Sequence, residues 1–182
     1  MNINLVKQLA DLKKMNVNLG SQLNAKIEAT VKHLFNLSLD DFEDFFTTKG
    51  FQVQKDQRNA VATCGNLKAS LTSRPNEGYF VYTCVCDLII GQEKYIVTFS
   101  SNQSGIAATA NCLPKDPDER LMQEIGLIIA SNERALNRIN NYDNERWHLV
   151  LKPQTKGRQA LKTATLFPTM YELLTSLTTE PS

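Results

Sequence analysis

The spacing of apolar residues changes near residue 50, and this change constrains the fold more than any other feature of the chain. Before it, apolar side chains recur every three to four residues, which is the period of an amphipathic α-helix. After it, apolar and polar residues alternate, which is the period of a β-strand with one buried face. Helical segments followed by a run of strands predict an α+β fold.

The N-terminal segment carries a seam of leucines with a period near 3.5 residues, typical of paired helices. Gly20 and Ser21 interrupt it, because glycine is costly inside a helix and serine caps one well. We therefore expect two helices, over about residues 3–18 and 22–36. Asn16 lies in the seam, where a polar residue can fix the register between paired helices. The seam would either pack on the protein's own sheet or mediate self-association. Its leucines are Leu5, Leu9, Leu12, Leu19 and Leu23.

A short acidic stretch follows and predicts the start of a third helix. Ser38 is a good N-cap, and acidic residues suit the positive end of a helix dipole. Gly50 is well placed to end this helix. The acidic residues are Asp40, Asp41, Glu43 and Asp44. This pattern favours helix-start chemistry over a catalytic or metal-binding role.

The middle of the chain predicts a meander of about five antiparallel strands, the last over residues 106–112. Cys84 and Cys86 lie two residues apart on one of them, so they share a face, and we interpret them as small buried hydrophobic side chains. No further closely spaced pair of cysteine or histidine ligands accompanies them. We therefore expect no metal site and no cofactor.

Asp87 lies in a strand whose two faces are both mostly apolar. A buried carboxylate is either paired or protonated, so one interpretation of Asp87 is a perturbed acid in a pocket. The other is that its face of the strand is open to water near the strand end, or that Asp87 meets a cross-strand lysine or arginine. The second interpretation is favoured. An enzyme would need Asp87, one of Cys84 and Cys86, and His148 to converge at a concave surface. The usual nucleotide-binding, serine-nucleophile and zinc-protease motifs are absent from the sequence, which favours a non-catalytic role.

Residues 114–140 predict a long amphipathic helix, capped by Asp116 and with Pro117 at its first position. A helix of about 24 residues spans about 36 Å, enough to cross a whole sheet. We expect it to pack on one sheet face through a broad apolar stripe. The stripe consists of Leu121, Met122, Ile125, Ile128, Ile129, Asn132, Leu136 and Ile139.

A further strand over about 147–152 and a short helix over about 166–177 complete the chain. The fold class predicted is thus α+β: an antiparallel meander of about five or six strands, with N-terminal helices and a long amphipathic helix packed on one face. We expect residues 1–36 to form a helical segment and residues 37–182 an α+β domain, together making one compact unit.

Charge and hydropathy narrow the classes of partner. The formal net charge of +1 argues against a globally basic nucleic-acid binder. Without an apolar run of membrane-spanning length or a signal-peptide pattern, we expect a cytoplasmic protein that does not contact membranes. A local basic segment, 152–162, would either contact phosphates or remain a solvated loop. Its basic residues are Lys152, Lys156, Arg158 and Lys162.

These observations favour a non-catalytic binding, adaptor or chaperone-like protein that acts through protein–protein contacts and self-associates. Its partners would be another protein, a second copy of itself, or both. The alternative is a nucleic-acid-associated accessory protein that uses segment 152–162 together with Lys7, Lys13 and Lys14.

Overall fold

The chain forms two compact units. The computed structural model describes residues 2–74, 85–102, 114, 116–153 and 165–179. Unit 1 comprises Met1–Ile27 and Gln103–Glu145, and unit 2 comprises Glu28–Asn102 and Arg146–Ser182. The boundary between the two units falls within a single helix, α1 (Ile3–Thr48), which contributes its first part to unit 1 and its second part to unit 2. The division of the chain into a helical segment 1–36 and an α+β domain 37–182 stays a prediction from the sequence.

Helix α1 is continuous over 46 residues and replaces the three helices expected from the sequence. Gly20 lies inside it, where the cost of about 1 kcal/mol relative to alanine is smaller than the gain from packing a long amphipathic helix. Ser38 also lies inside it and is buried. The Ser38 hydroxyl donates to the carbonyl oxygen of Leu34 at 2.9 Å, so it bonds within the helix instead of capping a new one.

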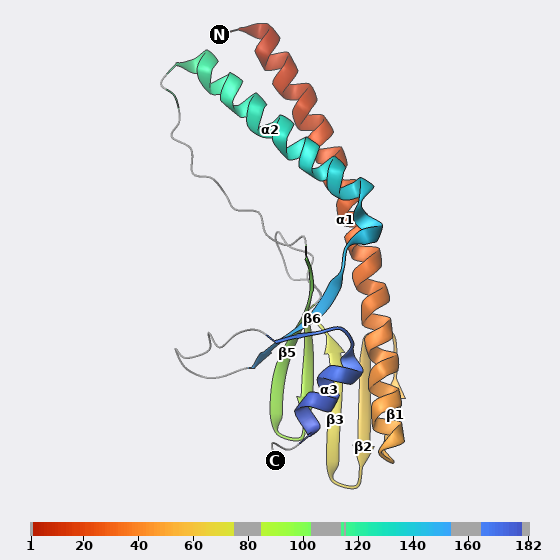
Figure 1. Cartoon of the computed structure of the whole chain (residues 1–182). Helices are drawn as coiled ribbons and strands as arrows, with labels where there is room; N and C mark the ends of the chain where they lie inside the picture. Colours follow the sequence, from red (N-terminus) through yellow and green to blue (C-terminus); the bar gives the residue numbers. More distant parts are fainter. Residues whose placement is uncertain (1, 75–84, 103–113, 115, 154–164, 180–182) are drawn as a thin grey trace. The chain divides into compact units, whose positions relative to one another are not determined.

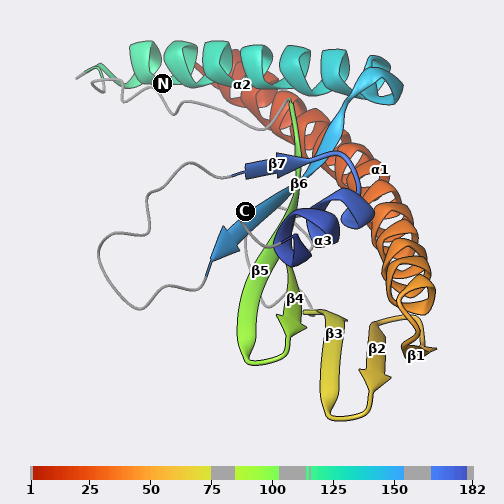
Figure 2. The same cartoon turned by 60° about the horizontal axis from the view of Figure 1, so that its bottom comes forward.

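Within the described residues, unit 2 contains a seven-stranded antiparallel sheet whose strands follow one another in chain order (Figure 1 and Figure 2). The α+β class and the antiparallel meander are therefore confirmed, with seven strands where five or six were expected. The predicted strand over residues 106–112 lies outside the described part of the chain. The strands are β1 (Gln52–Lys55), β2 (Asn59–Cys64), β3 (Leu67–Ser73), β4 (Val85–Ile90), β5 (Glu93–Ser101), β6 (Trp147–Pro153) and β7 (Thr165–Phe167).

A hairpin accounts for one of the additional strands. Residues 60–73, which alternate almost continuously in the sequence, are split into β2 and β3 by a turn at Gly65. The φ of +57° at Gly65 is a conformation that glycine adopts readily and other residues rarely do. The turn also changes the phase of the alternation, so the buried residues have even numbers in β2 and odd numbers in β3. They are Ala60, Ala62, Ala69 and Leu71.

The core of unit 2 lies between one sheet face and two helices, the second part of α1 and α3 (Met170–Thr178) (Figure 2). Cys86 points into this core and is fully buried, as the sequence predicted. Cys84 lies outside the described residues. The largest fully buried side chains come from α1, α3 and the central strands, namely Phe42, Phe45, Leu71, Leu88, Met170, Leu173, Leu174 and Val97.

The acidic stretch of α1 lies far from the start of that helix, and its carboxylates bind groups of other elements. The Asp41 carboxylate accepts backbone N–H bonds from Met170 at 3.0 Å and Tyr171 at 3.3 Å. These N–H groups belong to the first turn of α3, where helix N–H groups lack intrahelical partners. Asp40 and Glu43 instead form ion pairs with Lys55 of β1. An acid in one helix therefore caps another helix of the same unit.

Asp41→Ala is expected to lower the free energy of unfolding by about 1–2 kcal/mol, because it leaves two N–H groups of α3 without their acceptor. Urea titration followed by the fluorescence of Trp147, the single tryptophan, measures this loss in unit 2. Asp44→Ala, at an exposed position one turn away, is the matched control and should change stability little. Equal effects of the two substitutions would contradict the capping role.

Unit 1 consists of the first part of α1, helix α2 (Pro117–Asn140) and a short 3₁₀ turn, η1 (Tyr142–Asn144). The predicted start of α2 is confirmed, since the Asp116 carboxylate accepts the backbone N–H groups of Asp118 at 2.8 Å and Glu119 at 2.9 Å. The partner of α2 differs from the expectation. It packs against α1, in a unit separate from the sheet.

Candidate functional site

Helices α1 and α2 of unit 1 run in the same direction (Figure 1), and contacts between them keep a constant register. Near their N-terminal ends, the backbone N–H of Asn2 donates to the Asp118 carboxylate at 3.0 Å, across a separation of 116 residues. Near the other end, the Lys26 ammonium lies 5.5 Å from the ring centroid of Tyr142, at the same separation. A constant separation over this length means that each turn of α1 is opposite the corresponding turn of α2.

A polar pair lies midway along the two helices. The Asn16 amide nitrogen donates to the Asn132 side-chain oxygen at 2.7 Å and to the Ser131 hydroxyl at 3.1 Å. The Asn132 amide nitrogen in turn donates to the carbonyl oxygen of Leu12 at 3.2 Å. Asn132 is only 4% exposed, so a shift in register would leave buried amides without partners. Asn16 thus fixes register, as expected, between two helices of one chain.

The leucine seam lies against α2. At the separation of 116 residues set by the polar contacts, Leu9 is opposite Ile125, and both are 7% exposed. Leu19 is likewise buried, whereas Leu5, Leu12 and Leu23 are partly exposed. The seam therefore has a partner within unit 1. Self-association through the seam stays a prediction.

One flank of the helix pair is apolar. In parallel helix pairs, the positions that border the seam are usually charged, and Lys13 and Glu124 form such an ion pair at 2.7 Å on one side. The heptad positions on the other side carry large apolar residues at intervals of seven along α2, with one further residue on α1. We call these four residues the apolar flank. They are Met122, Ile129, Leu136 and Met15, which are 53%, 36%, 43% and 46% exposed.

The outer border of the apolar flank is acidic. The next positions outward in the heptad carry three carboxylates, Asp11 on α1 and Glu119 and Glu133 on α2, and no lysine or arginine. All three carboxylate residues are exposed. We call these three residues the acidic border. The basic residues Arg120 and Arg134 occupy heptad positions on the other side of the pair.

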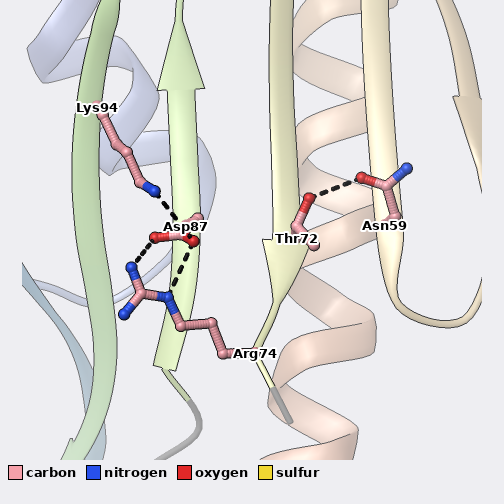
Figure 3. Close-up of polar contacts among 5 residues, drawn as sticks. All are labelled: Asn59, Thr72, Arg74, Asp87 and Lys94. Carbon is pink, nitrogen blue, oxygen red and sulfur yellow. Dashed lines mark hydrogen bonds and ion pairs between the residues drawn. The ribbon is translucent and has the colours of Figure 1, made fainter.

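A separate charged cluster lies on the sheet face opposite the core of unit 2 (Figure 3). Arg74 donates two hydrogen bonds to the Asp87 carboxylate, from Nε at 2.9 Å and from Nη2 at 2.5 Å. The Lys94 ammonium lies 3.4 Å from the same carboxylate. The hydrogen bond from Arg74 is the main cause that lowers the pKa of Asp87, while partial desolvation opposes it. The expectation that Asp87 pairs with a cross-strand base is confirmed.

Asp87→Asn is expected to lower stability at neutral pH and to have no effect at low pH. The folded-state pKa lies below the unfolded one, so the stabilisation is complete above about pH 4 and is lost as pH falls through the folded pKa. Urea midpoints measured from Trp147 fluorescence over this range test the prediction, with the exposed Asp44→Asn as control. A difference in midpoint that does not vary with pH would count against the ion pair as its cause.

Among the described residues of the enzyme hypothesis, Cys86, Asp87 and His148 do not converge. Cys86 and Asp87 are neighbours in β4 and point to opposite faces of the sheet. Cys86 is buried in the core, and His148 pairs across strands with Ser100, away from the Asp87 cluster. Within the described ranges, no group of three or more histidine, cysteine, aspartate or glutamate side chains is placed to hold a metal ion.

Most of the basic segment 152–162 falls outside the described residues, including Lys156, Arg158 and Lys162. Lys152 belongs to the end of β6, where it pairs with Ile96 of β5. The nucleic-acid hypothesis therefore stays a prediction from the sequence.

No family model matches the chain, and neither does any curated protein or solved structure. Among the helices of the described part of the chain, none combines the length and the apolar character needed to cross a membrane.

Proposed function

We propose that the protein is a non-catalytic binding module, of adaptor or chaperone-like type, that contacts another protein through the apolar flank of unit 1. The observation that carries this proposal is the exposure of four large apolar side chains, 36–53% each, beside a seam that already packs against α2. An apolar surface with a polar rim is typical of a protein interaction site.

The arrangement distinguishes this surface from ordinary exposed residues. Single apolar side chains on a protein surface are common and need no explanation. Here three of them recur every seven residues along one helix, and the fourth extends the surface onto the neighbouring helix. Burial of such side chains contributes about 25 cal/mol of favourable free energy per Å² of apolar surface. Binding of a partner that covers all four side chains is therefore favoured by this burial.

Site-specific photo-crosslinking tests the proposal. A photoreactive amino acid at the position of Ile129 should form covalent adducts with a discrete partner protein in cells that express the protein. The same amino acid at Lys14, an exposed position of α1 away from both borders of the seam, is the control. Adducts that are absent at 129, or equally abundant at 14, would exclude the apolar flank as a binding surface.

A further inference from the structure

We infer that the partner presents an amphipathic helix, with apolar residues at heptad spacing bordered by lysine or arginine, and that this helix packs along the apolar flank. The inference rests on the proposed function and specifies the chemistry of the partner. Three features of unit 1 carry it: the repeat distance along the flank, the contribution of both parallel helices to the flank, and the sign of the border charges.

The distance between successive residues of the flank along α2 favours a helical partner over an extended one. Met122, Ile129 and Leu136 are spaced by seven residues, which is about 10.5 Å along a helix axis. A partner helix presents apolar residues at the same repeat, whereas a β-strand presents side chains on one face every 6–7 Å or so. An extended peptide would therefore fall out of phase with the flank within two contacts.

Both helices of unit 1 contribute residues to the apolar flank. In a parallel pair, the heptad position of Met15 on one helix is next to the position of Leu136 on the other. The flank is therefore made by both helices, and a third helix along it contacts both, as in a three-helix bundle. The asparagine pair holds the two helices in register, so the residues of the apolar flank are arranged before a partner binds.

The charges of the acidic border indicate the charge expected beside the apolar residues of the partner helix. Asp11, Glu119 and Glu133 lie at the edge of the flank with no base among the neighbouring border positions. If two copies of the protein met flank to flank, their acidic borders would lie side by side and repel. A helix with lysine or arginine at its borders gains attraction at the same positions.

A head-to-tail contact between copies is the competing occupant, since the other side of the helix pair is basic. Two of its basic side chains already have acidic partners. Lys13 pairs with Glu124 at 2.7 Å, and Arg138 binds Glu145 through Nε at 2.6 Å and Nη2 at 3.0 Å. Neutralisation within the chain weakens the attraction of this side for an acidic border. The observations thus favour a basic helix from a different protein.

Two synthetic helical peptides of about three heptads test the inference by fluorescence anisotropy with the whole protein. Both carry leucine at the same heptad positions, and their borders are lysine and arginine in one peptide and glutamate in the other. We expect the basic peptide to bind about ten-fold more tightly or better at low salt, and the difference to shrink as salt increases. Glu119→Gln combined with Glu133→Gln should remove most of the difference while leaving unit 1 folded by circular dichroism.

The other outcomes separate the inference from the proposed function. Equal affinity of both peptides, lost on Ile129→Gln or on Met122→Gln, overturns the charge preference but leaves the apolar flank as a binding surface. Concentration-dependent association of the protein in analytical ultracentrifugation, abolished by either substitution, identifies a second copy as the occupant and overturns the inference. If neither peptide binds, the inference is wrong, and photo-crosslinking at position 129 then decides whether the proposed function survives.

Discussion

Phe42→Ala is expected to lower the free energy of unfolding of unit 2 by about 3–5 kcal/mol, the largest effect of any single substitution considered for this fold. The Phe42 side chain is fully buried, and its ring centroid lies 4.6 Å from that of Phe46. Truncation removes the transfer energy of the ring and leaves a cavity that neighbouring side chains on a rigid sheet fill only in part. Urea unfolding followed by Trp147 fluorescence measures the loss where it occurs.

Leu37→Ala is the matched control for this prediction. Leu37 lies in the same helix, but its side chain is 46% exposed, so the same kind of truncation should cost less than about 1 kcal/mol. If the two substitutions differ by less than about 1 kcal/mol, the second part of α1 does not form the core of unit 2.

Asn132→Leu is expected to destabilise unit 1 by about 1–3 kcal/mol, because it removes the main partner of the Asn16 amide in a largely apolar seam. The double substitution Asn16→Leu plus Asn132→Leu should recover most of this loss, since two facing leucines pack well in such a seam. We expect the double variant to have a weaker preference for one register between α1 and α2. Hydrogen exchange at the backbone amides of α2 measures both effects.

A double-mutant cycle provides the decisive comparison. If the asparagines act as a pair, the effects of Asn16→Leu and Asn132→Leu are not additive, and the coupling between them exceeds about 0.5 kcal/mol. Asn18→Leu, at an exposed position of α1, should show no coupling with Asn132→Leu. Additive effects throughout would mean that the hydrogen bond does not fix the register of α1 and α2.

Sequence patterns predicted hydrogen bonds correctly where the donor and the acceptor are close in the chain. The cap of α2 at Asp116 was predicted correctly, because the Asp116 carboxylate and the two backbone N–H groups that donate to it lie within three residues of one another. The same type of signal at Ser38 was misleading, because capping residues also occur inside helices. Asp41 does cap a helix, but that helix begins 129 residues later, and no local pattern connects the two.

The candidate surface was only partly predictable. Met122, Ile129 and Leu136 were recognised as part of one broad apolar stripe, and all three were expected to be buried. The signal was the width of that stripe, which exceeds what a seam between two helices can cover. Met15 carried no comparable signal, because its role depends on the register between α1 and α2.

The helical and alternating periods in the sequence were enough to establish the α+β class, the antiparallel meander and the amphipathic helix α2, but not the continuity of α1. Which apolar face packs against which other face is seen only in the tertiary structure. Hydrophobic burial has no direction, so a stripe predicts that a helix is covered without naming its partner. Contacts over more than a hundred residues, such as that between Asn16 and Asn132, made α1 the partner of α2 and left one flank exposed.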